Sequence, residues 1–283
     1  MENYQRYSKF VEDWKKARFP ARPSEEEMPI LDRLMRGIEI NEVKDDVKGK
    51  KKGTLNYNQG KKLLILGATP EFRDLGFKLK LKVTCADINI DMLEGMKQLM
   101  EFPNSEEVLV KCDWLNMPFE DNSFDLVFAE QSINIIEVEH FDDFLREAKR
   151  VLKDKGIFVL KAIVLLDENE ENILKKAREQ KRDIIYIYDK VCNMPKHYIN
   201  NVRSHKDVSK YFSGLIKQGK ISQAEYDKFI HHFGAICNAD LKLHALLKEE
   251  FEKILKTHFR IREILYGKDF EKHSLHPIYV LEK

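Results

Sequence analysis

The sequence lacks an apolar run long enough to cross a membrane. Its longest, residues 156–166, is interrupted by Lys161, whereas a transmembrane helix needs about 20 apolar residues. The first ten residues are polar and lack the apolar stretch of a signal peptide. Net charge is nearly absent too, with 49 Lys and Arg against 48 Asp and Glu, so no overall field attracts nucleic acid or an anionic membrane. These absences predict a cytoplasmic protein whose partner is neither nucleic acid nor membrane.

Paired cysteines are also missing. Cys85, Cys112, Cys192 and Cys237 form no CxxC motif, and the histidines near them do not have the spacing of a zinc site. We therefore predict four reduced thiols and no metal site. Cys85 and Cys112 fall in predicted buried strands, where a free cysteine behaves as a small apolar residue.

The composition is that of a folded globular protein. Of 283 residues, 43% are hydrophobic and 34% are charged, which suits one sizeable α/β domain with additions or two small domains. From residue 61, short apolar runs alternate with helical patterns, as in βαβ units that build a mostly parallel sheet. The predicted strands are 63–67, 81–86, 107–111, 124–129 and 156–164, with helices at 91–100 and 140–152 and an antiparallel strand pair at 259–265 and 277–281.

Four segments follow from this pattern. Residues 1–60 are predicted to be an N-terminal helical cap and linker, in which Ser24 and Glu27 fit a capping box. The linker at 41–60 contains KGKKKG; its lysines fit a solvated loop better than a phosphate contact. Residues 61–166 form the sheet core, residues 167–256 a charged helical insertion, and residues 257–283 the strand pair that completes the sheet.

Polar side chains follow the first two predicted strands. A parallel sheet binds its ligand at the carboxyl ends of its strands. The first strand leads into Gly67-Ala68-Thr69-Pro70-Glu71, a small-residue turn whose backbone can approach a ligand closely. The second ends at Asp87, 20 residues after Gly67, where a carboxylate can accept hydrogen bonds from ribose hydroxyls. The alternative for Asp87 is a cap for the helix that begins near Asp91.

The third and fourth strands end in a similar way. Asp113 and Trp114 follow the third, and they offer an acceptor for an adenine amino group and a ring for the base. Core packing of Trp114 is equally compatible with the sequence. The fourth strand ends at Glu130-Gln131-Ser132. Polar groups after four neighbouring strands indicate a binding site, although the first two also occur in folds that bind NAD.

At these residues the chain resembles the class I S-adenosylmethionine-dependent methyltransferases. The resemblance runs through VTCADINIDMLEGM, VLVKCDWLNMPFEDNSFDLVFAEQSINII and FLREAKRVLKDKGIFVL and covers about residues 60–165. It implies a doubly wound, Rossmann-like α/β sheet of seven strands whose last strand is antiparallel. It also implies S-adenosylmethionine as cofactor and S-adenosylhomocysteine as product. It implies Gly67 under the methionine part, Asp87 on the ribose, and Asp113 and Trp114 at the adenine. Further predicted cofactor contacts are Ala68, Thr69, Ile88, Leu115, Glu130 and Gln131.

The first motif departs from the common pattern of the family, an acid followed by Gly-x-Gly-x-Gly. Ile65 stands in the place of the acid, Thr69 in that of the second glycine and Glu71 in that of the third. In a variant with Gly-Ala-Thr-Pro-Glu, Glu71 would pair with the ammonium of the cofactor and Arg73 with its carboxylate. The alternatives are a helix-start charge for Glu71 and a surface position for Arg73.

No catalytic residue is assigned from the sequence. Methyl transfer from a sulfonium is an in-line displacement in which orientation and exclusion of water matter most, and a general base is optional. Glu130, His197, His231 and His232 are candidate bases by position and residue type only. In the N-terminal cap, Tyr7 and Trp14 are either lid contacts or the core of that helical layer.

Three functions remain open. The first is an S-adenosylmethionine-dependent methyltransferase acting on an unidentified small molecule. The second is a non-catalytic S-adenosylmethionine- or S-adenosylhomocysteine-binding or regulatory protein, since the first motif is altered. The third is an enzyme that uses a related nucleoside cofactor, such as an aminopropyl transferase, although no acidic cluster for a polyamine is evident.

Overall fold

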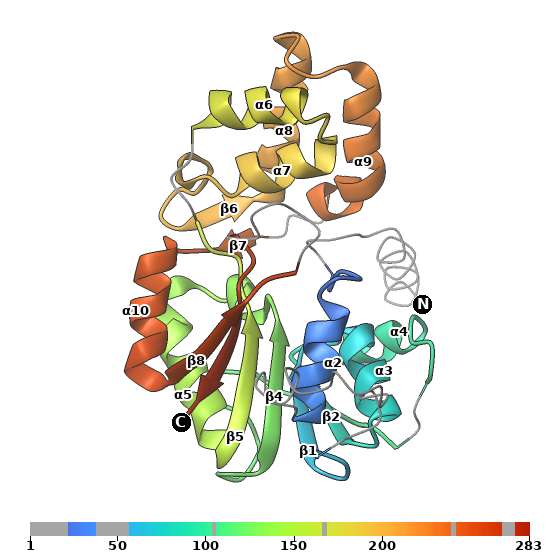
Figure 1. The fold of residues 1–283 in the computed structure, drawn as a ribbon, viewed down its shortest axis with the longest axis vertical. Helices are drawn as coiled ribbons and strands as arrows, with labels where there is room; N and C mark the ends of the chain where they lie inside the picture. Colours follow the sequence, from blue (N-terminus) through green and yellow to red (C-terminus); the bar gives the residue numbers. More distant parts are fainter. Residues whose placement is uncertain (1–21, 38–56, 104–105, 166–168, 239–241, 268–274) are drawn as a thin grey trace, which may run out of the picture.

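A seven-stranded sheet forms the centre of the protein, with strand order β3-β2-β1-β4-β5-β9-β8 (Figure 1). The computed structural model describes residues 22–37, 57–103, 106–165, 169–238, 242–267 and 275–283. Tyr7, Trp14 and most of the predicted linker lie outside these ranges. The strands are β1 (Lys62–Leu66), β2 (Lys82–Asp87), β3 (Val108–Lys111), β4 (Phe124–Glu130), β5 (Leu152–Lys161), β8 (Arg260–Leu265) and β9 (Ile278–Glu282).

The strand directions confirm the predicted fold class. β1 runs parallel to β2 and β4, β3 is parallel to β2, and β5 is parallel to β4. β9 is antiparallel to both β5 and β8, between which it lies. The chain builds outward from β1 to β3 and then returns to place β4 on the other side of β1. In sheets of this topology the ligand crevice lies at such a reversal, at the carboxyl ends of the two flanking strands, here β1 and β4.

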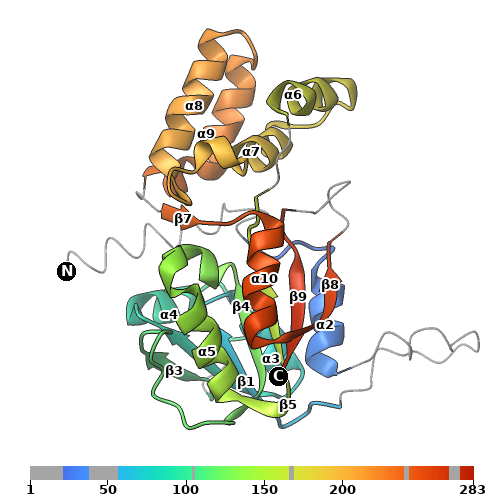
Figure 2. The same cartoon turned by 90° about the vertical axis from the view of Figure 1, so that its left-hand side faces the viewer.

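Helices cover both faces of the sheet, so its strands are apolar almost throughout. The side chains of successive residues alternate between faces. Leu63 and Ile65 pack under α2 (Met28–Arg36), α3 (Pro70–Lys78) and α4 (Ile90–Lys97). Leu64 and Leu66 pack under α5 (Phe141–Val151) and α10 (Lys248–His258), which lie in front of the sheet in Figure 2.

The predicted capping box is present just before α2. The backbone N–H of Glu27 donates to Ser24 Oγ at 3.1 Å, and the N–H of Ser24 donates to Glu27 Oε2 at 2.8 Å. The helix ends at Gly37, whose φ of 73° is in the left-handed region that glycine adopts without strain. Figure 1 shows that the amino end of α2 lies at the same edge as the carboxyl ends of β4 and β5. The capping box therefore stands beside the crevice.

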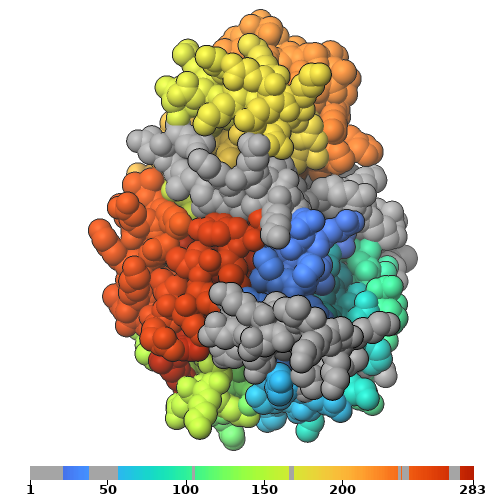
Figure 3. All heavy atoms as spheres, in the orientation of Figure 1, coloured from blue at the N-terminus to red at the C-terminus, as the bar shows by residue number. Residues whose placement is uncertain are grey.

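The insertion forms a lobe above this edge (Figure 3). It contains α6 (Glu170–Glu179), α7 (Ile184–Cys192), α8 (His205–Lys217), α9 (Gln223–Asn238) and a small sheet of β6 (Val202–Ser204) and β7 (Lys242–His244). An aromatic core of its own holds it together, with Tyr188 and Phe233 stacked at 3.9 Å between ring centroids. The chain leaves the sheet at Leu165 and returns at Leu247, and these two residues form a parallel bridge.

The predicted end of the insertion at residue 256 is too late. The helix before that point, α10, packs on the sheet, where Phe251 contacts the rings of Phe141 and Tyr279. A helical pattern predicts the helix but does not say against which layer its apolar face packs.

Candidate active site

The turn after β1 has the geometry that close approach to a ligand needs. Gly67 has a φ of 114°, and a Cβ placed there would meet only Ser132 Oγ, at 3.7 Å. The glycine is therefore required by the backbone conformation and not by crowding. Ser132, which follows β4, donates its hydroxyl to the carbonyl of Leu66 at 2.6 Å, so the ends of β1 and β4 are held together. Ala68 is buried and Thr69 is half-buried before α3 begins at Pro70.

Glu71 lies in the first turn of α3 and is paired with an arginine. Arg22 Nε donates to Glu71 Oε1 at 2.7 Å. The other oxygen, Oε2, is buried and accepts no hydrogen bond from the described residues. Both predictions for Glu71, a charge at a helix start and a partner for the ammonium of the cofactor, are thus compatible with the structure. The arginine next to Glu71 is Arg22.

Glu130 ends β4 in a second ion pair. Its Oε1 lies 2.8 Å from Lys161 Nζ, at the end of β5, and the same ammonium lies 2.7 Å from Glu27 Oε2. All three side chains are at most 4% exposed. Burial raises the pKa of Glu130 to about 7 against the opposing effect of Lys161, and the nearby Glu27 and Glu71 raise it further.

The predicted role of Arg73 is wrong. Its guanidinium forms a bidentate pair with Glu107, at 2.5 and 2.9 Å, and donates to the carbonyl of Leu93 at 2.8 Å. The side chain is neither on the surface nor at the crevice: both members of the ion pair are at most 1% exposed. Arg73 joins α3 to α4 and to the segment before β3, and all its nitrogens are used there.

Asp87 ends β2 as predicted. Its Oδ1 accepts the backbone N–H of Asn89 at 2.9 Å, and burial raises its pKa above the ordinary value. The cap of α4 is Asn89, whose side chain accepts from Asp91 and Met92. The alternative in which Asp87 is itself the helix cap is therefore wrong. Ile88, next to it, is 65% exposed.

Trp114 packs in the core, which corrects the prediction that its ring lies on adenine. The indole N–H donates to the carbonyl of Ala86 at 2.7 Å, and the ring meets Phe144 edge-on. Only 8% of the residue is exposed. Asp113 is exposed, and its Oδ1 accepts the backbone N–H of Leu115, so this carboxylate and the turn remain at the strand end.

Comparison with known proteins identifies the segment that carries these strand ends. Residues 67–160 match the model of a family described as a methyltransferase domain. The match begins at the Gly67 turn and runs through the ends of β2, β3 and β4 into β5. Residues 67–160 are named the methyltransferase domain after the family that they match.

Two curated relatives share part of the methyltransferase domain. A sterol 24-C-methyltransferase of Yarrowia lipolytica is 34% identical over 93 residues, which are 33% of this chain and 23% of that protein. A sterol 24-C-methyltransferase of Schizosaccharomyces pombe is 35% identical over 72 residues, 25% of this chain and 18% of that protein. The chain thus spans less than a quarter of the length of either relative.

One solved structure is similar over nearly the whole chain. A putative zinc-dependent alcohol dehydrogenase from Rhodobacter sphaeroides aligns with 96% of this chain and 97% of its own, with a TM-score of 0.55 and 12% identity. At this identity the likeness concerns the fold only. Within the described ranges, no group of three His, Cys, Asp or Glu side chains is placed to hold a metal ion. None of the described helices is long and apolar enough to cross a membrane.

The insertion is tied to the methyltransferase domain through Asn134, just after β4. The Asn134 amide donates to the carbonyls of Ile163 and His244 and accepts the N–H of Ile163. The side chain is 1% exposed. Gln131, the residue between Glu130 and Ser132, takes a left-handed φ of 55°, which turns the chain from β4 into this contact.

The candidate bases differ in their surroundings. Burial lowers the pKa of His197 to about 4, so this imidazole is neutral at physiological pH, and its ring packs against Tyr211 at 4.6 Å. His231 and His232 lie on α9 in the insertion. Glu130 alone among the four belongs to a strand of the methyltransferase domain.

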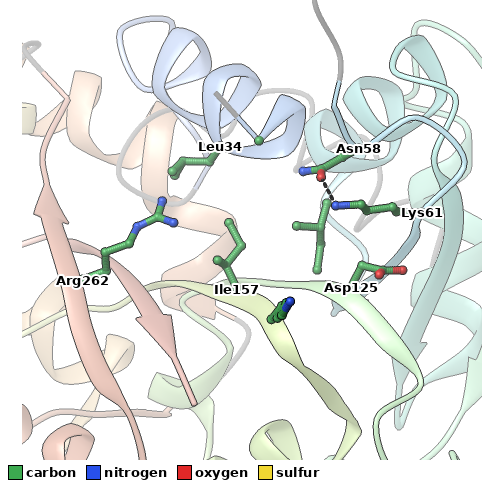
Figure 4. A pocket seen from close by; sticks show the side chains of 9 residues that line it. Leu34, Asn58, Lys61, Asp125, Ile157 and Arg262 are labelled. Carbon is green, nitrogen blue, oxygen red and sulfur yellow. Dashed lines mark hydrogen bonds between the residues drawn. The ribbon is translucent and has the colours of Figure 1, made fainter. Parts of the chain in front are cut away.

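A small pocket lies at the other edge of the sheet (Figure 4). It has a volume of about 130 Å³, and Lys61, Asp125, Ile157 and Arg262 are among the residues that line it. Lys61 immediately precedes β1, and Asp125 is the second residue of β4. The pocket therefore stands at the amino ends of the strands, opposite the crevice.

Sequence reasoning missed three members of the site: Arg22, Glu27 and Lys161. Lys161 was visible as a lone charge within an apolar run, a pattern that indicates a buried ion pair. Glu27 was visible only as part of the capping box. Arg22 has no local pattern that distinguishes it.

Proposed function

We propose that this protein is an S-adenosylmethionine-dependent methyltransferase that transfers the methyl group to a small molecule. The observation that carries the proposal is the Arg22–Glu71 pair at the turn after β1, next to Glu130. The amino-acid end of the cofactor has one ammonium and one carboxylate. A guanidinium beside two carboxyls complements both groups, because arginine binds carboxylates in a bidentate manner and carboxylates accept from ammonium.

In this proposal Glu71 and Glu130 take the place of the acid that the first motif lacks at Ile65. Arg22 takes the role first assigned to Arg73. The ion pair between Arg22 and Glu71 opens when the cofactor binds. Arg22 then pairs with the carboxylate of the cofactor, and Glu71 pairs with its ammonium. Gly67, Ala68 and Thr69 contribute the turn along which the methionine part lies.

The nucleoside end is assigned to the ends of β2 and β3. Asp87 accepts hydrogen bonds from the ribose hydroxyls, and Ile88 provides an exposed apolar surface that the adenine covers. Asp113 and the backbone at Leu115 lie next to the adenine amino group. Trp114 supports this turn from the core.

The chain's own residues bind and orient the reactants, as an in-line displacement requires. When bound, S-adenosylmethionine supplies the electrophilic methyl group. The acceptor is placed between the β4 end and the insertion, where Asn134 holds the two parts together and water is excluded. The near-zero net charge favours a small molecule over nucleic acid as acceptor.

Calorimetry with three ligands tests the cofactor assignment. S-adenosylmethionine and S-adenosylhomocysteine carry the amino acid, whereas 5′-methylthioadenosine lacks it. Arg22→Gln is expected to weaken S-adenosylhomocysteine binding about tenfold, since a charge-assisted hydrogen bond contributes about 1.5–3 kcal/mol, and to leave 5′-methylthioadenosine unaffected. Arg36→Gln, an arginine paired with Asp32 within α2, is the matched control.

A wild-type protein that binds neither S-adenosylmethionine nor S-adenosylhomocysteine would refute the proposal. If they bind, formation of S-adenosylhomocysteine with pools of small-molecule acceptors separates an enzyme from a protein that only binds the cofactor. Fractionation of a pool that yields S-adenosylhomocysteine then identifies the acceptor.

A further inference from the structure

A hollow of about 510 Å³ lies in the lobe, at two of the turns that join its helices. Residues from the end of α6, the turn into α7, and the turn between α8 and α9 line it. In Figure 1, α6 and the turn between α8 and α9 lie in the part of the lobe farthest from the sheet. The hollow has the size of a small-molecule site, about 300–1,000 Å³, and is distinct from the crevice at the strand ends.

The lining of this hollow presents charge. Its apolar members are at most 6% exposed each: Leu174, Ala177, Ile187 and Ile221. Among the described residues that line it, four carry a positive charge: Arg178, Lys181, Arg182 and Lys220. One described lining residue, Glu225, is acidic. Because the whole chain has a net charge of only +1, the positive charge is concentrated locally.

The carboxylates at the hollow already have partners. Oε2 of Glu225 accepts from the backbone N–H and from the hydroxyl of Ser222, both at 2.7 Å, in a capping box at the start of α9. Glu170 lies 3.6 Å from Lys220 Nζ and is shared with Lys196. Even with Glu170 and Glu225 both counted, the four cations exceed the acids by two charges.

Two of the four cations have no acidic partner. Within the part of the chain that the structure describes, neither Arg178 nor Lys181 forms an ion pair. Asp183, two residues after Lys181, pairs instead with Lys228 at 2.9 Å. Arg178 Nη2 donates to the carbonyl of Lys220 at 3.0 Å, so its guanidinium is positioned between α6 and the turn that follows α8.

The backbone at Lys181 favours glycine, yet a lysine stands there. Both α6 and α8 end in the same hydrogen-bonded motif, in which a left-handed residue follows the last helical turn. At α8 this residue is Gly219, with a φ of 66°, whereas at α6 it is Lys181, with a φ of 51°. Glycine takes this conformation without strain. A charged side chain is thus present at a position where glycine would fold more readily.

Helix dipoles do not account for the excess of positive charge. Cations are favoured at the carboxyl end of a helix, where the dipole is negative. At this hollow, however, each carboxyl end is followed after a short turn by an amino end, α6 by α7 and α8 by α9. The opposite partial charges, about half a unit each, offset one another. The two unbalanced positive charges therefore call for an anion from outside the chain.

We propose that the hollow binds the phosphate group of a small molecule. A phosphate monoester carries about 1.5–2 negative charges at pH 7, which matches the excess, whereas a carboxylate supplies only one. The remaining N–H groups of Arg178 donate to phosphate oxygens, and the ammonium groups of Lys181 and Lys220 add charge. No covalent bond forms or breaks. The site is separate from the proposed cofactor site, and its failure would leave the proposed function untouched.

Nuclear magnetic resonance titration of the isotope-labelled protein with glycerol 3-phosphate tests the site. The backbone amide signals of the two turns that line the hollow are expected to shift to saturation. Glycerate, which carries a single carboxylate, is expected to bind at least about threefold more weakly, because its charge is lower. Glycerol 3-phosphate that leaves these signals in place, or glycerate that binds equally tightly, would overturn the proposal.

Three variants separate binding from stability. Arg178→Gln is expected to weaken glycerol 3-phosphate about threefold, as the loss of an exposed ion pair does. Lys176→Gln changes an exposed lysine of α6 outside the hollow and is expected to retain the wild-type affinity. Lys181→Gly is expected to weaken binding while the unfolding temperature stays equal or rises, because glycine suits the left-handed backbone.

The glycine variant decides even if Arg178→Gln disturbs the lobe. Wild-type affinity for glycerol 3-phosphate in a folded Lys181→Gly protein would show that this lysine takes no part in binding and would refute the site. An equal loss of affinity in Lys176→Gln and Arg178→Gln would likewise refute it, since the effect would then reflect only the overall charge of α6.

Discussion

Lys161 Nζ lies 2.8 Å from Glu130 Oε1, where β4 and β5 end side by side. Each is the last residue of its strand, and the two are paired neighbours in the register of the sheet. Well-packed apolar residues of similar volume are often at least as stabilising as a buried charged pair. We therefore expect this pair to serve binding or positioning.

Removal of the lysine tests how strongly the carboxyls depend on it. Lys161→Met leaves Glu27 and Glu130 buried without their cation, which is expected to lower the free energy of unfolding by about 3–5 kcal/mol near pH 8. Near pH 5 the loss is smaller, because a carboxyl whose pKa is raised in the folded state stabilises that state while protonated and loses this contribution as pH rises through the folded pKa.

Urea denaturation of wild type and variant at these two pH values measures the difference. Lys153→Met removes a partly exposed partner of Asp125 and is expected to cost less than about 1 kcal/mol at either pH. An equal loss of unfolding free energy for Lys161→Met at both pH values would contradict a raised pKa at Glu130.

The Arg73–Glu107 pair predicts a stability effect without a cofactor effect. Arg73→Met leaves the Glu107 carboxylate buried with Lys97, at 3.7 Å, as its remaining cation among the described residues, and is expected to cost about 3–5 kcal/mol of unfolding free energy. The double variant Arg73→Met/Glu107→Gln should recover part of this loss, because no unpaired charge remains. A stable Arg73→Met protein that no longer binds S-adenosylhomocysteine would restore the original role of this arginine.

Trp114, near the proposed adenine end, likewise predicts an effect on stability without an effect on cofactor binding. Trp114→Phe removes the hydrogen bond to the Ala86 carbonyl and is expected to cost about 1–3 kcal/mol of stability. Its affinity for S-adenosylhomocysteine should change less than about threefold, because the ring packs in the core and only 8% of the residue is exposed. Thermal unfolding and calorimetry of the same preparation measure both. A loss of affinity with unchanged stability would show that the ring contacts the ligand.

Asp87 predicts an effect on the nucleoside itself. Asp87→Ala is expected to weaken S-adenosylhomocysteine and 5′-methylthioadenosine by the same factor, about 10–100-fold, because both ligands carry the ribose and a hydrogen bond to a charged group contributes about 1.5–3 kcal/mol. Asp91→Ala, an exposed carboxylate in the first turn of α4, is the control. Selective loss of one ligand places Asp87 away from the ribose.

The sheet could be predicted because alternation of apolar runs with helical patterns is local information. All seven predicted strands of the sheet are present, with ends displaced by a few residues. The direction of β9 was also predictable, since two strands joined by a short polar segment pair in an antiparallel manner. Which residues follow each strand is then fixed by the sequence, and Asp87 and Glu130 stand where expected.

The partners of buried charges could not be predicted in this way. Arg73 meets Glu107 across 34 positions of the chain and Lys161 meets Glu27 across 134. No local pattern encodes such distances. The sequence placed Arg73 on the first helix after β1 but gave no sign of which face of that helix is buried against α4. Trp114 shows the same limit, because a turn residue can point to the crevice or to the core.

The bridge between Leu165 and Leu247 bears on how this protein acquired its lobe. The chain leaves and re-enters the sheet through adjacent residues, with Leu165 donating to Leu246 and Lys248 donating back to Leu165. A short loop across this bridge would therefore close the sheet without moving β5 or α10. We therefore expect that the lobe can be replaced by another insertion while the strands of the parent sheet keep their register.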